Sequence, residues 1–77
     1  MQITIVCQPG ADATHWCALY LKGARAEAKR KGDSLALLSL DDALVRFKTD
    51  RPTCAAILST SRAWTANAAE ALSAVGV

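Results

Sequence analysis

The chain has 77 residues, of which 52% are hydrophobic and 21% are charged. This composition excludes a disordered segment and allows one small globular domain. The formal net charge of +2 is too small to indicate nucleic acid or an anionic membrane as a partner by itself. We therefore expect a single folded unit over residues 1–77.

The first half of the chain predicts a strand and then a long helix. Residues 2–7 form a β-branched run that ends at a Gln-Pro-Gly turn, and such continuous apolarity is typical of a strand covered on both faces. The helix that follows is expected to end at Gly32, a suitable left-handed C-cap. Gly23 inside this helix costs about 1 kcal/mol relative to alanine, so we expect its backbone to pack closely against a neighbouring element.

The second half repeats the alternation of strands and helices. The predicted elements are a strand at residues 34–39, a short helix at 41–47, a strand at 53–58 and a helix at 62–75. Such alternation predicts right-handed βαβ units. The expected fold is α/β, a three-layer βαβαβα arrangement with a parallel sheet in strand order 2-1-3.

The third predicted strand lies at an edge of this sheet without the usual protection. Residues 53–58 are apolar and uncharged, whereas natural edges are blunted by charge, proline or a bulge. Val77 resembles the first residue of a fourth strand. We therefore expect either a fragment of a longer protein or a homodimer, or other self-association, formed through the third strand or the helices.

The cysteines indicate a reducing compartment. Cys7, Cys17 and Cys54 are odd in number and have no short repeated spacing, which argues against a disulfide framework. The spacing of cysteines and histidine predicts no metal site, and no cofactor is expected. Neither a signal peptide nor a membrane-spanning stretch is visible, so we expect a cytoplasmic protein without a membrane partner.

Two segments carry a family resemblance. In residues 15–32 an aromatic residue opens the helix, a glycine-alanine pair lies mid-helix, an acidic-alanine pair follows and a glycine ends it; these are Trp16, Gly23-Ala24, Glu27-Ala28 and Gly32. Residues 51–59 and 68–76 resemble a third strand and the following helix and glycine of the same family. This family is the periplasmic-binding-protein-like group, which includes the effector-binding domains of LacI-type transcriptional regulators.

The resemblance implies the N-terminal part of a Rossmann-like ligand-sensing subdomain. Its function would be to sense a small-molecule effector, a sugar, whose binding shifts the DNA affinity of a LacI-like regulator; it would not be an enzyme. The chain departs from the family in three respects. Residues 41–50 are shorter than the family's usual helix, no helix-turn-helix precedes the first strand, and the second lobe is absent. DNA would therefore be contacted only through a region absent from this chain.

The resemblance also places ligand contacts in the loop after the first strand, where an aromatic residue stacks on a sugar. By position, the candidates are Asp12, His15 and Trp16. Each has a structural alternative: helix N-capping for Asp12 (a position that Thr14 could equally occupy), a solvated first-turn position for His15 and core packing for Trp16.

A second group of candidates follows the third strand. Ser59, Thr60 and Ser61 precede a helix N-terminus at the carboxyl end of the sheet, where ligands bind in open α/β proteins. This position suits a hydroxyl or an anion, although capping alone explains at least one of the three.

An alternative function as an enzyme depends on Cys7. The cysteine ends the first predicted strand and is similar in position to the cysteine of phosphotransferase-system IIB proteins, which accepts a phosphoryl group. A thiol at a helix N-terminus would have a lowered pKa and be a good nucleophile. Against this, Pro9 removes an amide donor and Asp12 would repel phosphate.

Overall fold

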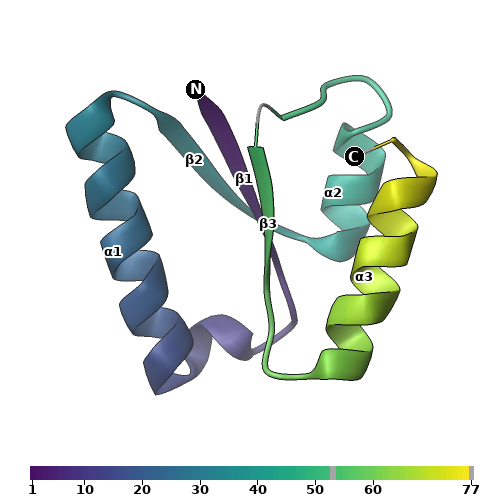
Figure 1. Ribbon diagram of the computed structural model, residues 1–77, viewed down its shortest axis with the longest axis horizontal. Coiled ribbons are helices and arrows are strands. Elements are labelled where there is room, and N and C mark those ends of the chain that lie inside the picture. Colours follow the sequence, from purple (N-terminus) through teal and green to yellow (C-terminus); the bar gives the residue numbers. More distant parts are fainter. Residues whose placement is uncertain (53, 77) are drawn as a thin grey trace.

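In the computed structural model, which describes residues 1–52 and 54–76, strands and helices alternate along the chain (Figure 1). The elements are β1 (Gln2–Cys7), the short 3-10 helix η1 (Ala11–Ala13), α1 (His15–Lys31), β2 (Ser34–Ser39), α2 (Leu40–Arg46), β3 (Cys54–Leu58) and α3 (Arg62–Ala74). The sheet is parallel in the order β2-β1-β3, which confirms the predicted α/β fold and strand order. Thr53, the predicted start of the third strand, and Val77, the predicted start of a fourth, lie outside the described residues.

β1 is the central strand because its residues suit burial on both faces. It pairs with β2 along its whole length and with β3 along residues 3–7. Its last four residues, Thr4, Ile5, Val6 and Cys7, are all buried. A continuous buried run is what a parallel strand covered by helices on both sides requires, as the sequence predicted.

Helices cover both faces of the sheet, with α1 on one face and α2 and α3 on the other (Figure 1). Because successive side chains of a strand point to opposite faces, β1 contributes to two separate cores. The core between α1 and the sheet consists of Ile5, Cys7, Ala11, Cys17, Leu21 and Leu58. The core between the sheet and the other two helices consists of Val6, Ala43, Phe47 and Leu72. The predicted three-layer architecture is therefore confirmed.

The helix ends follow local side-chain chemistry. Gly32 ends α1 with a left-handed φ of 74°, a conformation that glycine adopts without steric penalty, as predicted. α2 begins at Leu40, slightly earlier than expected, because the Ser39 hydroxyl accepts a hydrogen bond from the Asp42 N–H at 3.2 Å. Within the described parts of the chain, no helix is both long and apolar enough to cross a membrane.

The expectation that Gly23 packs against a neighbouring element is wrong. A Cβ atom built on Gly23 would meet no atom within 4 Å, apart from its own helix backbone and immediate chain neighbours. Leu19 and Tyr20 on the same side of α1 are 49% and 54% exposed. The stripe of α1 that faces the sheet consists instead of Cys17, Leu21 and Ala28. Two stripes of α1 carry apolar residues at helical spacing. The stripe with the smaller side chains packs on the sheet, and the stripe that begins at Trp16 faces solvent.

Candidate functional site

The carboxyl ends of the strands lie side by side at one edge of the sheet. Cys7, the last residue of β1, pairs with Ser39 of β2 and with Leu58 of β3. From there the chain passes from β1 to α1 on one face and from β3 to α3 on the other face (Figure 1). In doubly wound sheets, ligands bind in the crevice where the connections diverge in this way. The ends of β1 and β3 therefore form the candidate site.

The side chain of Gln8 bridges this crevice. Its Oε1 atom accepts hydrogen bonds from the Ser59 hydroxyl at 3.0 Å, the Thr60 backbone N–H at 3.0 Å and the Thr60 hydroxyl at 3.2 Å. The Gln8 backbone N–H donates to the Leu58 carbonyl at 2.9 Å, which extends the contact between β1 and β3. One glutamine thus holds the loop before α3 against the end of β1.

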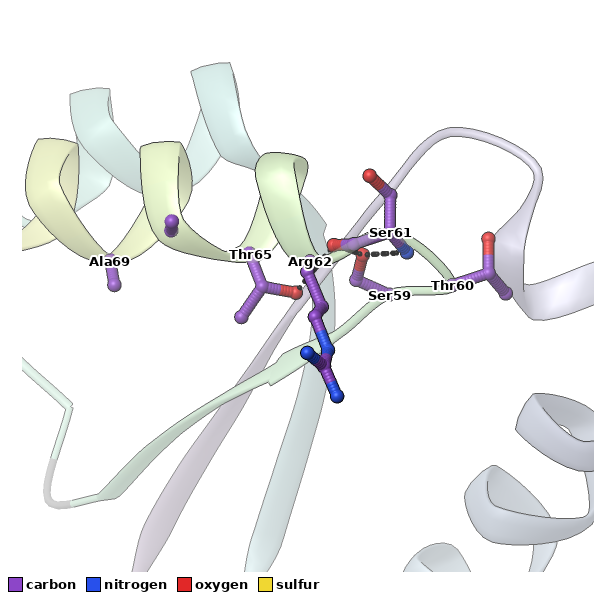
Figure 2. Close-up of a pocket in the computed structure, with 7 residues that line it drawn as sticks. Ser59, Thr60, Ser61, Arg62, Thr65 and Ala69 are labelled. Atoms are coloured by element: carbon purple, nitrogen blue, oxygen red, sulfur yellow. Dashed lines mark hydrogen bonds between the residues drawn. The ribbon is translucent and has the colours of Figure 1, made fainter.

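Ser59 and Ser61 also form local hydrogen bonds (Figure 2). The Ser59 hydroxyl accepts from the Ser61 N–H at 3.0 Å and lies 2.9 Å from the Ser61 carbonyl. The Ser61 hydroxyl caps α3 by accepting from the Trp64 N–H at 3.2 Å. Capping therefore explains Ser61. Since the Ser59 hydroxyl has one hydrogen, it donates either to Gln8 or to the Ser61 carbonyl at any moment.

An open groove of about 460 Å³ continues from this loop along the flank of α3. Its lining residues are Ser59, Thr60, Ser61, Arg62, Thr65, Ala66 and Ala69. Figure 2 shows that Arg62, Thr65 and Ala69 project from the same side of the helix. The sequence places Arg62 at the end of the loop after the third strand, where ligands are expected to bind, but Arg62 itself was not among the predicted ligand contacts.

Trp16 and His15 lie on the first turn of α1, and both are exposed. Trp16 is 79% exposed, so the alternative that it packs in the core is wrong. The two rings form an edge-to-face pair with centroids 5.4 Å apart. His15 is a solvated first-turn residue, as its alternative proposed. Neither ring lines the groove beside α3, so the structure does not enclose all the predicted residues around one cavity.

Asp12 lies in η1, ahead of α1, and it does not cap that helix. The N-cap position belongs to Thr14, whose hydroxyl donates to the Ala11 carbonyl at 2.7 Å, so the capping interpretation of Asp12 is wrong. Asp12 instead lines a hollow of about 260 Å³ at the ends of β1 and β2. The other residues that line it are Cys7, Gln8, Pro9, Gly10, Leu37, Leu38 and Ser39. Gln8 thus lies between this hollow and the Ser59–Ser61 loop.

The environment of Cys7 does not favour a nucleophilic role. Its side chain is buried in the core under α1, and the thiol donates a hydrogen bond to the Gln8 carbonyl at 3.3 Å. Burial raises the pKa of the Cys7 thiol, and a hydrogen bond from the Asp12 backbone N–H offsets this only in part. A phosphoryl acceptor needs an accessible thiolate, which these features oppose.

No metal centre is visible in residues 1–52 and 54–76, where no group of three or more His, Cys, Asp or Glu side chains could hold an ion. No protein-family model matches the chain. Searches of curated proteins and of solved structures likewise return no match. Functional inference therefore depends on the geometry at the carboxyl edge of the sheet.

Proposed function

We propose that this chain is the first part of an effector-binding domain like those of LacI-type transcriptional regulators, and that it binds a sugar at the carboxyl edge of its sheet. The observation that carries the proposal is the ring of Trp16, 79% exposed on the first turn of α1. A tryptophan presents a large apolar surface that normally becomes buried. A ligand stacked on the ring would remove this surface from water.

The other groups at this edge suit the hydroxyls of a sugar. The carboxylate of Asp12 offers acceptors, and the hydroxyls of Ser59 and Thr60 both donate and accept. Binding sites for polar small molecules commonly combine one apolar or aromatic wall with a few such polar groups. The edge therefore offers both parts of a sugar site, with Trp16 on one side and the serine-threonine loop on the other.

The proposed mechanism is a population shift between two positions of the loop before α3. A sugar hydroxyl could replace the Ser59 hydroxyl on Gln8 Oε1. Ser59 would then keep a partner, because the Ser61 carbonyl lies 2.9 Å away. The Thr60 N–H and hydroxyl, which also donate to Gln8 Oε1, are exposed and would bind water instead. The loop could thus move relative to β1 without leaving a buried polar group unsatisfied. In a regulator, such a shift would change how a dimer presents its DNA-binding parts.

We place this activity in the cytoplasm. Cys7, Cys17 and Cys54 are free thiols, and the third of these is exposed. Exposed free thiols persist in reducing compartments and oxidise outside them. A cytoplasmic location also agrees with a role in transcriptional regulation.

Calorimetric titration of the protein with a panel of mono- and disaccharides tests the proposal. Trp16→Ala should weaken binding of the best sugar about tenfold, because loss of an aromatic stack costs roughly 1 kcal/mol or more. Leu19→Ala is the matched control, since this side chain is 49% exposed on the same helix and should leave affinity unchanged. The proposal is wrong if no sugar binds, or if Trp16→Ala binds as well as the parent protein.

A further inference from the structure

Positive charge in this chain is concentrated on one helix. α1 holds five of the nine lysine and arginine residues but only one of the seven acidic residues, so the rest of the chain has more acidic than basic residues. The one acidic residue, Glu27, pairs with the last two cations of the helix. The other three cations are exposed and form no ion pair in the part of the chain that the structure describes. We call these three residues the basic flank: Lys22, Arg25 and Lys29.

The basic flank lies on the side of α1 next to β2. The opposite side is defined by a groove in which Tyr20 and Glu27 lie together with Cys54 and Ala56 of β3. Because successive helical residues are about 100° apart, the basic flank lies about 140–200° around the helix from Tyr20. The flank therefore points away from β3 and past β2, the strand over which α1 packs (Figure 1).

β2 is an edge strand of the sheet. Within the described residues it pairs only with β1, and it contains neither a charged residue nor a proline. A strand that followed α3 by a right-handed crossover would join the sheet beyond β3, so β2 would still be an edge of a larger sheet. Proteins usually protect such edges, because free backbone groups on an apolar strand readily pair with another chain.

Two residues of β2 direct their backbone groups outward from this edge. The Ser34 N–H donates a hydrogen bond to the Met1 carbonyl at 3.0 Å, so the backbone groups of Ser34 point toward β1. Alternate residues of a strand direct their backbone groups to opposite sides, so those of Leu35 and Leu37 point outward. The side chains of these two leucines pack against the core under α1, on the same face of the sheet as the basic flank.

The basic flank lies at the level of these two leucines. Leu35 lines the groove under α1 together with Ala24 and Ala28, so it lies near the level of residue 26. Leu37 lies about 6.6 Å further along the strand, and at about 1.5 Å per helical residue this reaches the level of residue 22, because α1 runs opposite to β2. The first two cations of the basic flank therefore lie at the levels of Leu37 and Leu35.

We propose that the β2 edge binds an extended acidic segment of a partner protein, which adds to the sheet as a further strand. The backbone of the segment pairs with Leu35 and Leu37. Acidic side chains at every second position of the segment lie on the α1 face, where Lys22 and Arg25 reach them. In recognition of this kind, backbone hydrogen bonds supply affinity and alternate side chains supply specificity. The contact does not involve Trp16 and does not depend on sugar binding.

Charge disfavours a second copy of this chain at the same edge. Two β2 strands related by a two-fold axis would run antiparallel and place both copies of α1 on one face of the joined sheet. The basic flank of each copy would then face the basic flank of the other, and such like-charge contacts oppose association. An acidic segment has the opposite charge and meets no such repulsion.

Binding of a labelled synthetic peptide, measured by fluorescence anisotropy, tests the role of charge. A short peptide that alternates glutamate with valine should bind, whereas one that alternates lysine with valine should not. Lys22→Glu and Arg25→Glu should each raise the Kd of the glutamate peptide about tenfold. Lys48→Glu is the matched control, since it makes the same change of charge at an exposed residue after α2, and it should leave the Kd unchanged. Circular dichroism verifies that each variant is folded.

Three results of this titration would overturn the proposal. The first is absence of binding by the glutamate peptide, and the second is equal binding of the glutamate and lysine peptides. The third is an equal loss of affinity in Lys22→Glu, Arg25→Glu and Lys48→Glu, which would mean that only the net charge of the protein matters.

A second experiment distinguishes strand addition from a contact made by charge alone. Two versions of the glutamate peptide carry methyl groups on alternate backbone nitrogens, one on each of the two alternate sets. Only one set faces β2 in an added strand, so one version should lose binding and the other should retain it. Hydrogen exchange at the Leu35 and Leu37 amides should also slow when the unmodified peptide binds. Equal binding of both methylated versions, or unchanged exchange at these amides, would indicate a general polyanion site and overturn the proposal.

Discussion

The Oε1 atom of Gln8 lies 3.0 Å from the hydroxyl of Ser59, and this hydrogen bond joins residues 51 positions apart in the chain. Gln8 directly follows the central strand, and Ser59 directly follows the strand beside it. The contact therefore spans the place where the connections to α1 and α3 diverge. A single polar side chain couples the two loops that a ligand at this edge would touch.

Removal of this contact should loosen the loop before α3. Gln8→Ala should lower the free energy of unfolding by about 0.5–1.5 kcal/mol, because the exposed Thr60 N–H exchanges its protein acceptor for water. Urea denaturation followed by circular dichroism measures this change. Hydrogen exchange at the Thr60 amide should also become faster. Gln8→Glu keeps an acceptor oxygen and should retain slow exchange; equally fast exchange in both variants would argue against the bridge.

A substitution at Gly23 tests whether this face of α1 is open to solvent. Gly23→Ala should raise the free energy of unfolding by about 0.5–1 kcal/mol, because alanine favours the helix and its Cβ meets open space. Gly32→Ala should have the opposite effect, since the backbone there has a φ of +74°. Thermal unfolding of both variants distinguishes them. Destabilisation by Gly23→Ala would mean that another element packs against this face of α1.

The thiols should differ sharply in reactivity. Burial raises the pKa of Cys7, so its thiol stays protonated at neutral pH. Cys54 is exposed and should be alkylated first by iodoacetamide, whereas Cys7 and Cys17 should react only on unfolding. Mass spectrometry of the partly labelled protein identifies the sites. Rapid alkylation of Cys7 in the folded protein would instead support the phosphocarrier alternative.

The raised pKa of Cys7 also makes stability depend on pH. The folded state favours the protonated thiol, so Cys7 contributes to the free energy of unfolding. This stabilisation is fully present below the unfolded-state pKa of about 8.5, and it is lost as pH rises through the higher folded-state pKa. Cys7→Ala should remove this part of the alkaline loss. If the parent protein and Cys7→Ala lost stability in parallel above about pH 8.5, the effect would not come from Cys7.

The sheet was predictable from the sequence because its central strand is distinctive. The buried run from Thr4 to Cys7 has no alternation, which only a strand covered on both faces allows. Right-handed crossovers then leave few arrangements of three strands. The role of Ser61 as a helix cap was equally predictable, because its hydrogen bond to the Trp64 N–H joins residues only three positions apart in the chain.

The candidate site was less predictable because it depends on distances between elements. Trp16 and Cys17 start two stripes of α1 with the same helical spacing, and only packing on the sheet determines which is buried. The 3-10 turn before α1 separates Asp12 from the helix N-terminus, which periodicity does not reveal. Gln8 is a polar residue directly after a buried strand, and that position was the available sign of its role.

Amide and indole NMR spectra recorded during titration with a sugar test the proposed site most directly. Binding at the carboxyl edge should shift the signals of the Trp16 indole, Gln8 and Thr60. Gly32 lies beyond the other end of α1 and should not shift. This pattern would establish the sugar site where we place it. Shifts confined to the Gly32 end of the sheet, or no shift with any sugar of the panel, would contradict it.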